Sequence, residues 1–245
     1  MSQSLDSSLL SSRFTRALFY ASLMIFAVYY LLPLFVMLTN SLKTLDEIRA
    51  GNMLALPRSI TIEPWQKAWD SAQIGVDPSG LKPYFMNSVL MVIPAVLIST
   101  MLGAIYGYIL TKWNFRGAGV MFGLMLFSCF IPFQIVLIPM ARVLGLIGLA
   151  GTTSGLVLVH VVYGIGFTTL FFRNYYNAFP DELVRAALLD GAGFFRIFWR
   201  ILLPSSGPII VVTIIWQFTN IWNDFLFGAS FADFDSQPIT VALNN

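Results

Sequence analysis

The chain has 245 residues, of which 57% are hydrophobic and only 11% are charged, and its formal net charge is +2. A soluble domain carries about 25% charged residues, so this composition excludes an ordinary soluble protein and indicates an integral membrane protein surrounded by lipid. The small net charge gives no reason to expect a nucleic-acid partner. The single cysteine, Cys129, excludes an intramolecular disulfide framework, and no metal site is expected.

The N-terminal part of the chain predicts a tail, a first membrane span and a long polar connection. Residues 1–16 form a Ser-rich cytoplasmic tail, and the apolar run 17–38 is long enough to cross a bilayer. That run exceeds a signal-peptide core and lacks a cleavage site, so we expect it to remain in the membrane. Residues 40–86 carry balanced charges and are predicted to lie outside, with a short helix at 63–72.

Further apolar stretches predict four more spans, so that residues 17–245 form a single membrane domain. Gly103 and Gly107 are spaced as G-x-x-x-G, which predicts close helix packing. Basic residues gather in the short loops on one side, which places the N-terminus in the cytoplasm. Five spans leave the C-terminus outside, and the polar end resembles a loop, so a sixth helix is expected beyond residue 245. The predicted fold class is an all-α, polytopic helical bundle with later spans at 87–110, 119–140, 152–172 and 208–227.

Residues 179–204 (FPDELVRAALLDGAGFFRIFWRILLP) concentrate charge between two apolar segments on the predicted cytoplasmic side. Pro180 and the two acids after it predict a helix start, because acids complement the positive end of the helix dipole. Gly191 is predicted to be a hinge, Asp190 to cap a second helix, and that helix to end before Pro204. An amphipathic segment resting in the headgroups and a docking element for a soluble partner explain this pattern equally well.

The same residues resemble a family signature. RAALLDGAGFFRIFWRILLP is similar to the EAA signature of ABC-transporter permease subunits, in which E-A-A is followed by D-G and a closing L-P. Arg185 stands where the family usually has Glu, so a salt bridge made by that Glu is not expected here unless Glu182, one turn earlier, supplies it. The resemblance implies ATPase-coupling residues at Glu182, Arg185, Ala186, Ala187, Asp190, Gly191, Phe194 and Phe195.

Five further segments narrow the resemblance to carbohydrate-importer permeases of the maltose-permease type, with a glucose or mannose subgroup as a finer expectation. They follow the family's order along nearly the whole chain: NSLKT at 40–44, FMNSVL at 85–90, IPFQIVLIP at 131–139, FFRNYYNAFPDEL at 171–183 and WNDFLF at 222–227. The resemblance implies the type I ABC importer permease fold and a place in the bacterial inner membrane. It also implies three partners: a second permease subunit, a cytoplasmic ABC ATPase dimer and an external sugar-binding protein.

The absence of a nucleotide-binding motif indicates where ATP would be bound. The sequence contains no G-x-x-x-x-G-K-[ST] phosphate loop, so ATP and Mg²⁺ would be bound by the partner ATPase. This chain is therefore expected to carry no catalytic residue and no cofactor of its own.

Polar side chains at membrane depth usually face a water-filled cavity or the bundle interior, so they are the candidate substrate contacts. Aromatic rings stack on the C–H faces of a sugar, and carboxamide and carboxylate groups bond to its hydroxyls. Each candidate also has a structural explanation: an interhelical hydrogen bond, a partner for carbonyls freed by prolines, or an interfacial anchor. Sugar contacts could also lie mostly on the second permease. The predicted pathway residues are Gln134, His160, Asn220, Trp222, Asn223 and Asp224.

Other functions compete with this interpretation. An ion-gradient-driven secondary sugar transporter should show repeated halves and a buried pair of ion-binding carboxylates, and the sequence shows neither. A membrane enzyme would need a cluster such as histidine with carboxylates, whereas the chain has a single histidine. A scaffold protein has no positive signature here. The predicted function is therefore sugar import through a permease subunit coupled to a separate ATPase.

Overall fold

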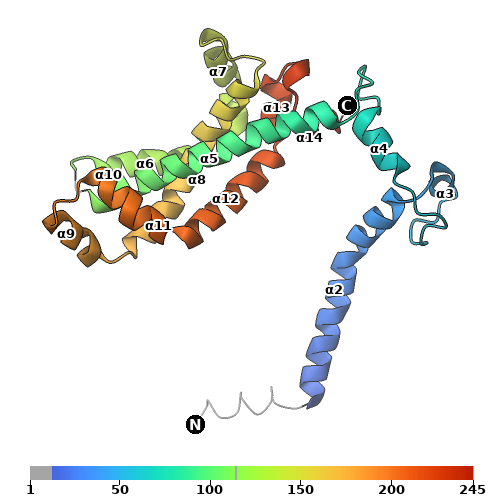
Figure 1. The fold of residues 1–245 in the computed structure, drawn as a ribbon, viewed down its shortest axis with the longest axis horizontal. Coiled ribbons are helices and arrows are strands. Elements are labelled where there is room, and N and C mark those ends of the chain that lie inside the picture. Colours follow the sequence, from blue (N-terminus) through green and yellow to red (C-terminus); the bar gives the residue numbers. More distant parts are fainter. Residues whose placement is uncertain (1–12, 114, 245) are drawn as a thin grey trace. The chain divides into compact units, whose positions relative to one another are not determined.

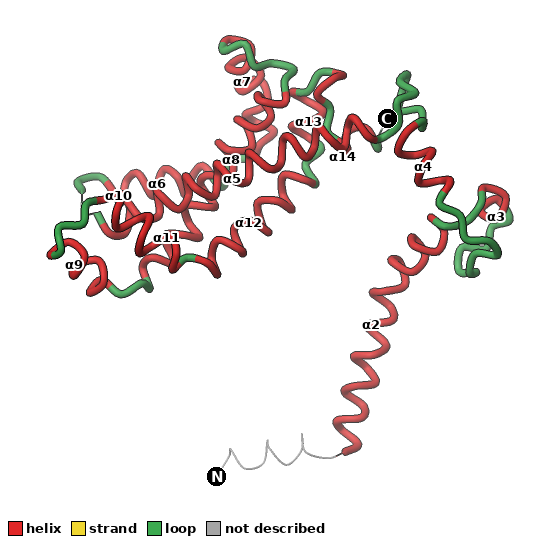
Figure 2. The backbone as a smooth tube through the Cα atoms, viewed as in Figure 1, coloured by secondary structure: helices red, strands yellow, loops and turns green. Residues whose placement is uncertain are grey.

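The computed structural model describes residues 13–113 and 115–244. The chain divides into two compact units, residues 1–72 and 73–245, and the predicted external connection 40–86 crosses their boundary. Among the described residues there are helices, turns and two isolated β-bridges but no strand (Figure 2). The predicted all-α class is confirmed. Of the predicted cytoplasmic tail, residues 1–12 lie outside the described part of the chain.

The first unit contains one long apolar helix followed by two short polar ones. α2 (Arg13–Ser41) is long and apolar enough to cross a membrane and remains continuous through Pro33. α3 (Leu45–Arg49) follows directly, and α4 (Glu63–Asp70) confirms the short helix predicted at 63–72, with Pro64 in its first turn.

The second unit is a helical bundle built around α5 (Lys82–Lys112) and α8 (Thr153–Asn177), with α12 (Gly207–Trp222) packed against both (Figure 1). Small residues allow α5 and α8 to approach closely. A Cβ atom on Gly103 would lie 2.8 Å from the Thr168 backbone carbon, so only glycine fits there. The predicted G-x-x-x-G packing is therefore confirmed.

One predicted span is bent within itself, and another is bent against the segment before it. The stretch predicted as one span at 119–140 forms α6 (Ala118–Ser128) and α7 (Phe133–Leu146), whose axes meet at 102°. The break falls just before Pro132, because proline lacks a backbone N–H and disfavours a helical residue in front of it. Within the described residues, the five predicted spans correspond to three single helices and two pairs of helices bent at a short break.

The second bent pair joins the end of segment 179–204 to α12. α10 (Phe194–Ile197), a π-helical turn (Phe198–Leu202) and α11 (Leu203–Ser205) run on from one another and meet α12 at 78°. The prediction that this helix stops before Pro204 is wrong. In a regular α-helix the proline ring would clash with the carbonyl four residues earlier, and the wider π turn at that place relieves the clash.

The last predicted span, 208–227, also ends early. α12 stops at Trp222, and the Asp224 carboxylate then accepts hydrogen bonds from two first-turn amides of α13 (Leu226–Phe231), at 3.1 and 3.3 Å. A 3₁₀ turn (Phe234–Ser236) and α14 (Ile239–Ala242) complete the described chain.

The core of the second unit has two parts at opposite ends of the bundle (Figure 1). One part joins the beginnings of α5 and α8 to α13. The other joins their far ends to α9 (Asp181–Leu189), α10 and the π turn, with Tyr108 and Tyr176 completely buried. Segment 179–204 is therefore packed into the bundle core along one side.

Candidate functional site

The two helices of segment 179–204 are joined by a tight glycine turn. The N–H of Gly191 donates to the carbonyl of Leu188 (3.0 Å), and the N–H of Ala192 donates to the carbonyl of Ala187 (2.9 Å). This pair of bonds is a Schellman motif, which requires a left-handed residue at its centre. Gly191 has a φ of +75°, so the predicted glycine hinge is confirmed as a left-handed turn.

Asp190 does not have the predicted capping role. It is the C-cap residue of α9, and its N–H donates to the carbonyl of Ala186 at 3.0 Å. The N-cap of α10 is Gly193, and no side chain caps that helix. The prediction was wrong because the Schellman turn extends the connection, so the Asp190 carboxylate lies too early in the chain to reach the first amides of α10.

The predicted coupling residues divide between two faces of the segment. Ala187 is only 9% exposed, and the ring of Phe194 lies 4.7 Å from that of Tyr108, centroid to centroid, so these two hold the segment on the bundle. Ala187, one of the predicted coupling residues, thus packs against the bundle and does not face a partner. Leu189, which sequence reasoning missed, is 89% exposed. The other predicted residues are exposed: Glu182, Arg185, Ala186, Asp190, Gly191 and Phe195.

Lys112, the last residue of α5, ties the start of α9 to the bundle. Its ammonium group donates to the Phe179 carbonyl (2.8 Å) and forms an ion pair with Asp181 (2.6 Å). The hydrogen bond from Lys112, together with its charge, lowers the pKa of the Asp181 carboxyl. The pair therefore stabilises the fold above the ordinary pKa of aspartate and is lost as pH falls through the lowered value.

Replacing Asp181 with Asn should weaken the attachment of the start of α9 to the bundle. We expect faster hydrogen exchange at the first-turn amides of α9 in Asp181→Asn, because the ion pair with Lys112 is lost. Glu182→Gln is the matched control, since it removes the same charge from the same helix turn without breaking an ion pair among the described residues. Hydrogen exchange is measured by mass spectrometry. Equal exchange rates in the two variants would show that the ion pair with Lys112 does not stabilise the first turn of α9.

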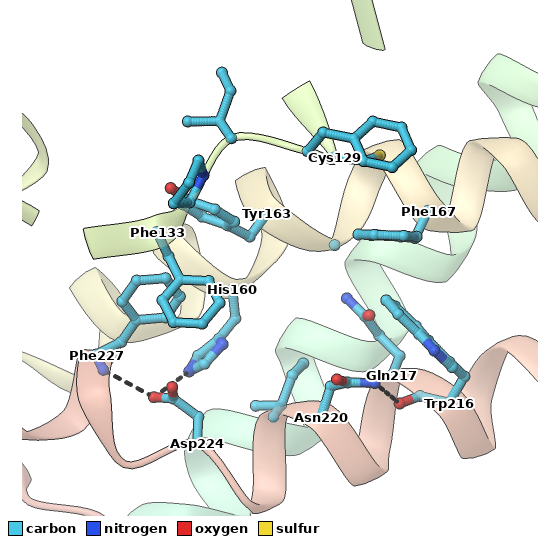
Figure 3. A pocket seen from close by; sticks show the side chains of 15 residues that line it. Cys129, Phe133, His160, Tyr163, Phe167, Trp216, Gln217, Asn220, Asp224 and Phe227 are labelled. Carbon is cyan, nitrogen blue, oxygen red and sulfur yellow. Dashed lines mark hydrogen bonds and ion pairs between the residues drawn. The ribbon is translucent and has the colours of Figure 1, made fainter. Parts of the chain in front are cut away.

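A cavity of about 600 Å³ lies where α8, α12 and the break between α6 and α7 meet (Figure 3). It brings together three of the predicted pathway residues: His160, Asn220 and Asp224. Half of the remaining lining residues are aromatic. The site therefore combines polar groups at one end with apolar ring surfaces around them.

The other three predicted pathway residues are not part of the lining. Trp222 stacks on Phe218 at 5.5 Å between ring centroids, Asn223 donates to the Thr219 carbonyl, and Gln134 is exposed on α7. The helical repeat of 3.6 residues explains why Trp222 and Asn223 do not line the cavity. Positions 217 and 220 share one face of α12 and Asp224 lies just past the end of that helix, whereas positions 222 and 223 point away from the cavity.

His160 and Asp224 approach each other without forming a hydrogen bond. The distance from His160 Nε2 to Asp224 Oδ2 is 3.7 Å, which is too long for one. His160 is 5% exposed and its Nε2 atom has no hydrogen-bond partner within the described chain, so the predicted interhelical hydrogen bond is not formed. Its ring packs edge-on against Phe227. Figure 3 shows the imidazole and the carboxylate facing each other at the cavity wall.

Gln217 is the lining residue that sequence reasoning missed. It is 2% exposed and donates to Ser99 Oγ at 2.9 Å, which links α12 to α5. Gly164 on α8 leaves room for the side-chain amide of Gln217, since a Cβ on residue 164 would overlap that amide. The sequence did contain a signal for Gln217: it is a polar residue in an apolar helix, and its spacing of three positions from Asn220 places both on one helix face.

Comparison with known families decides the class of this chain. The profile of a family described as the inner membrane component of binding-protein-dependent transport systems matches residues 99–244, more than half of the sequence. The chain belongs to this family. It is thus a transport permease, and the sequence-based identification as an ABC-transporter permease is confirmed.

Named relatives extend the match over most of the permease. A probable ABC transporter permease protein of Pyrococcus horikoshii is 38% identical and covers 94% of this chain and 82% of its own. The diacetylchitobiose uptake system permease protein of Streptomyces coelicolor is 32% identical, covering 88% and 69%. The glucose import system permease protein of Saccharolobus solfataricus is 31% identical, covering 85% and 72%.

A solved structure confirms the fold of the permease. A chain of a bacterial ABC transporter involved in the import of the acidic polysaccharide alginate superposes with a TM-score of 0.81. The match covers 95% of this chain and 81% of that one at 20% sequence identity, so it supports the architecture alone.

Proposed function

We propose that this permease forms half of a sugar pathway through the bacterial inner membrane and that ATP hydrolysis on a separate cytoplasmic ATPase dimer drives it. Relatives named for diacetylchitobiose uptake and for glucose import support a sugar as the substrate class. A second permease subunit and an external sugar-binding protein complete the proposed complex. The glucose or mannose subgroup stays a prediction, because these relatives are named for different sugars.

The observation that carries the proposal is the two-faced segment 179–204. Its outer face exposes charged and large apolar side chains, including Arg185, Leu189 and Phe195. Its inner face is part of the core that holds the far ends of α5 and α8. A partner that moves the outer face would therefore move the spans with it as a rigid body. This arrangement favours a docking element over a segment that only rests in the headgroups.

The proposed orientation places the N-terminus and segment 179–204 in the cytoplasm, and the ATPase dimer binds there. ATP and Mg²⁺ are bound by that dimer, since this sequence carries no phosphate loop. The permease contributes no catalytic group. Its side chains bind and release sugar, and its helices alternate between two arrangements.

Reconstitution into proteoliposomes with the second permease, the ATPase dimer and the binding protein tests this function. We expect uptake of a radiolabelled neutral sugar only when ATP and all four components are present. Omitting the ATPase should reduce uptake to the background of protein-free vesicles. Uptake that persists without the ATPase and collapses when an ionophore dissipates the ion gradients would support secondary transport and overturn the proposal.

A further inference from the structure

Segment 179–204 continues into α12 through a sharp corner at Ser206. α11 ends at Ser205 and α12 begins at Gly207, and the helices before and after the corner meet at 78°. The segment exposes the face proposed to meet the ATPase, whereas α12 lines the cavity. A movement that passes from the segment to α12 along the chain must therefore cross this corner.

Two consecutive tyrosines at the end of α8 hold the corner through hydrogen bonds. The Tyr175 hydroxyl donates to the Ser205 carbonyl, and the hydroxyl oxygens of Tyr176 and Ser206 lie 3.0 Å apart. Tyr176 and Ser206 are both 0% exposed, whereas Ser205 lies at the surface. Because the second pair is buried, no water molecule can take the place of a lost partner when that bond breaks.

Ser206 connects the tyrosine to the π turn. Its hydroxyl lies 2.6 Å from the Leu202 carbonyl, which can only accept, so the single hydroxyl proton of Ser206 is donated there. Ser206 Oγ therefore accepts from the hydroxyl of Tyr176. The N–H of Ser206 donates to the Leu203 carbonyl at 3.0 Å, so the side chain makes the bond to Leu202 that the backbone N–H makes in a regular α-helix. A chain of two hydrogen bonds thus runs from α8 through the corner to the π turn.

These hydrogen bonds supply a directional restraint that apolar packing lacks. Phe198 and Leu202 are buried in the core that holds the segment on the bundle, but apolar burial is non-directional. A hydrogen bond weakens steeply as its angle departs from linearity. The bond between Tyr176 and Ser206 therefore restrains the angle at which α11 meets α12.

We infer that Tyr176 is a positioning residue for coupling. Through Ser206 it holds the corner rigid, so that a movement of segment 179–204 turns α12 instead of being absorbed by bending at the corner. The inference rests on the proposed function, because it assumes that an ATPase moves the segment. It concerns a buried bond inside the permease and no residue of the exposed face.

The number of sugar molecules taken up per ATP hydrolysed tests this role in the proteoliposomes described above, with the radiolabelled sugar that the wild type takes up. Tyr176→Phe removes one buried hydroxyl and keeps the ring, whose centroid lies 5.8 Å from that of Phe172. We expect the ratio to fall at least threefold, because hydrolysis continues while movement is absorbed at the corner. A merely structural role lowers the amount of folded transporter, which reduces uptake and hydrolysis together and leaves the ratio unchanged.

Tyr106→Phe is the matched control, since it removes the same hydroxyl from α5, where Tyr106 makes no hydrogen bond within the described chain. It should keep the wild-type ratio. Ser206→Ala should lower the ratio at least as much as Tyr176→Phe, because it also removes the bond to Leu202. The double variant should behave as Ser206→Ala alone, since both changes break the same bond.

A wild-type ratio in Tyr176→Phe, or an equal fall in Tyr106→Phe, would overturn the inference. A double variant of Tyr176 and Ser206 whose loss is the product of the two single losses would overturn it as well, because the two hydroxyls would then act separately. ATP-dependent uptake by the wild-type transporter reports the proposed function independently. Where that uptake is observed, these results refute the positioning role alone.

Discussion

Replacing Gly103 with leucine should prevent α5 from pairing with α8 and leave no stable permease. A Cβ alone would lie 2.8 Å from the Thr168 backbone carbon, and a backbone atom cannot turn aside as a side chain can. Overpacking a well-packed core costs about 1–3 kcal/mol, and more where the backbone must shift. We expect a loss of more than about 3 kcal/mol, a large part of the total stability of a typical domain. The measurement is the yield of monodisperse transporter after detergent extraction.

Gly123→Leu provides the control for this experiment. Gly123 lies in α6, another apolar helix, and nothing lies within 4 Å of the Cβ that a substitution would add. Its leucine variant should extract with a yield close to wild type. A normal yield for Gly103→Leu, or an equal loss for both variants, would mean that the close approach of α5 and α8 is not what the glycine provides.

Replacing Gly191 with valine should uncouple the ATPase while the chain remains inserted and assembled. The φ of +75° places this residue in the left-handed region, where a non-glycine residue costs roughly 1–2 kcal/mol and a β-branched one more. Space is not the obstacle, since no atom lies within 4 Å of the added Cβ. The Schellman turn would have to open, and the exposed face of α9 would move relative to the core. We expect stimulation of the ATPase by sugar-loaded binding protein to fall below about a tenth of wild type, as a loss of more than about 1.4 kcal/mol in coupling implies.

Gly193→Val is the matched control two residues away. Gly193 has a φ of −82°, which valine adopts without strain, and it also has no atom within 4 Å of an added Cβ. This variant should keep most of the stimulated ATPase rate. An unchanged rate in Gly191→Val would contradict the role of the turn. Equal losses in both variants would mean that the surface at this point matters and its backbone conformation does not.

Several features of the permease could be predicted because they depend on local sequence. Hydropathy over about 20 residues is a property of composition, so the apolar stretches were located correctly even where the helices bend. Gly191 was predicted to turn the chain because few other residues tolerate a positive φ. The motifs of segment 179–204 indicated the family for the same reason, since they lie in one continuous stretch.

Other features were decided by packing. Whether Ala187 faces a partner or the core depends on how α9 is rotated against α5 and α8, and no local pattern specifies that rotation. Asp190 had the chemistry of a helix cap, but the turn that follows it left the carboxylate out of reach. The chain breaks before Pro132 but α7 runs on through Pro139, and the local pattern around the two prolines did not distinguish them.

The sequence by itself determined that this chain is an α-helical membrane permease with a charged segment between two spans, because apolar length and contiguous motifs are local properties. Only the tertiary structure decided that His160 and Asp224 meet at one cavity while Trp222 and Asn223 lie outside it. The meeting of those two residues depends on the packing of α8 against α12, and such long-range contacts cannot be derived from the spacing of residues along either helix.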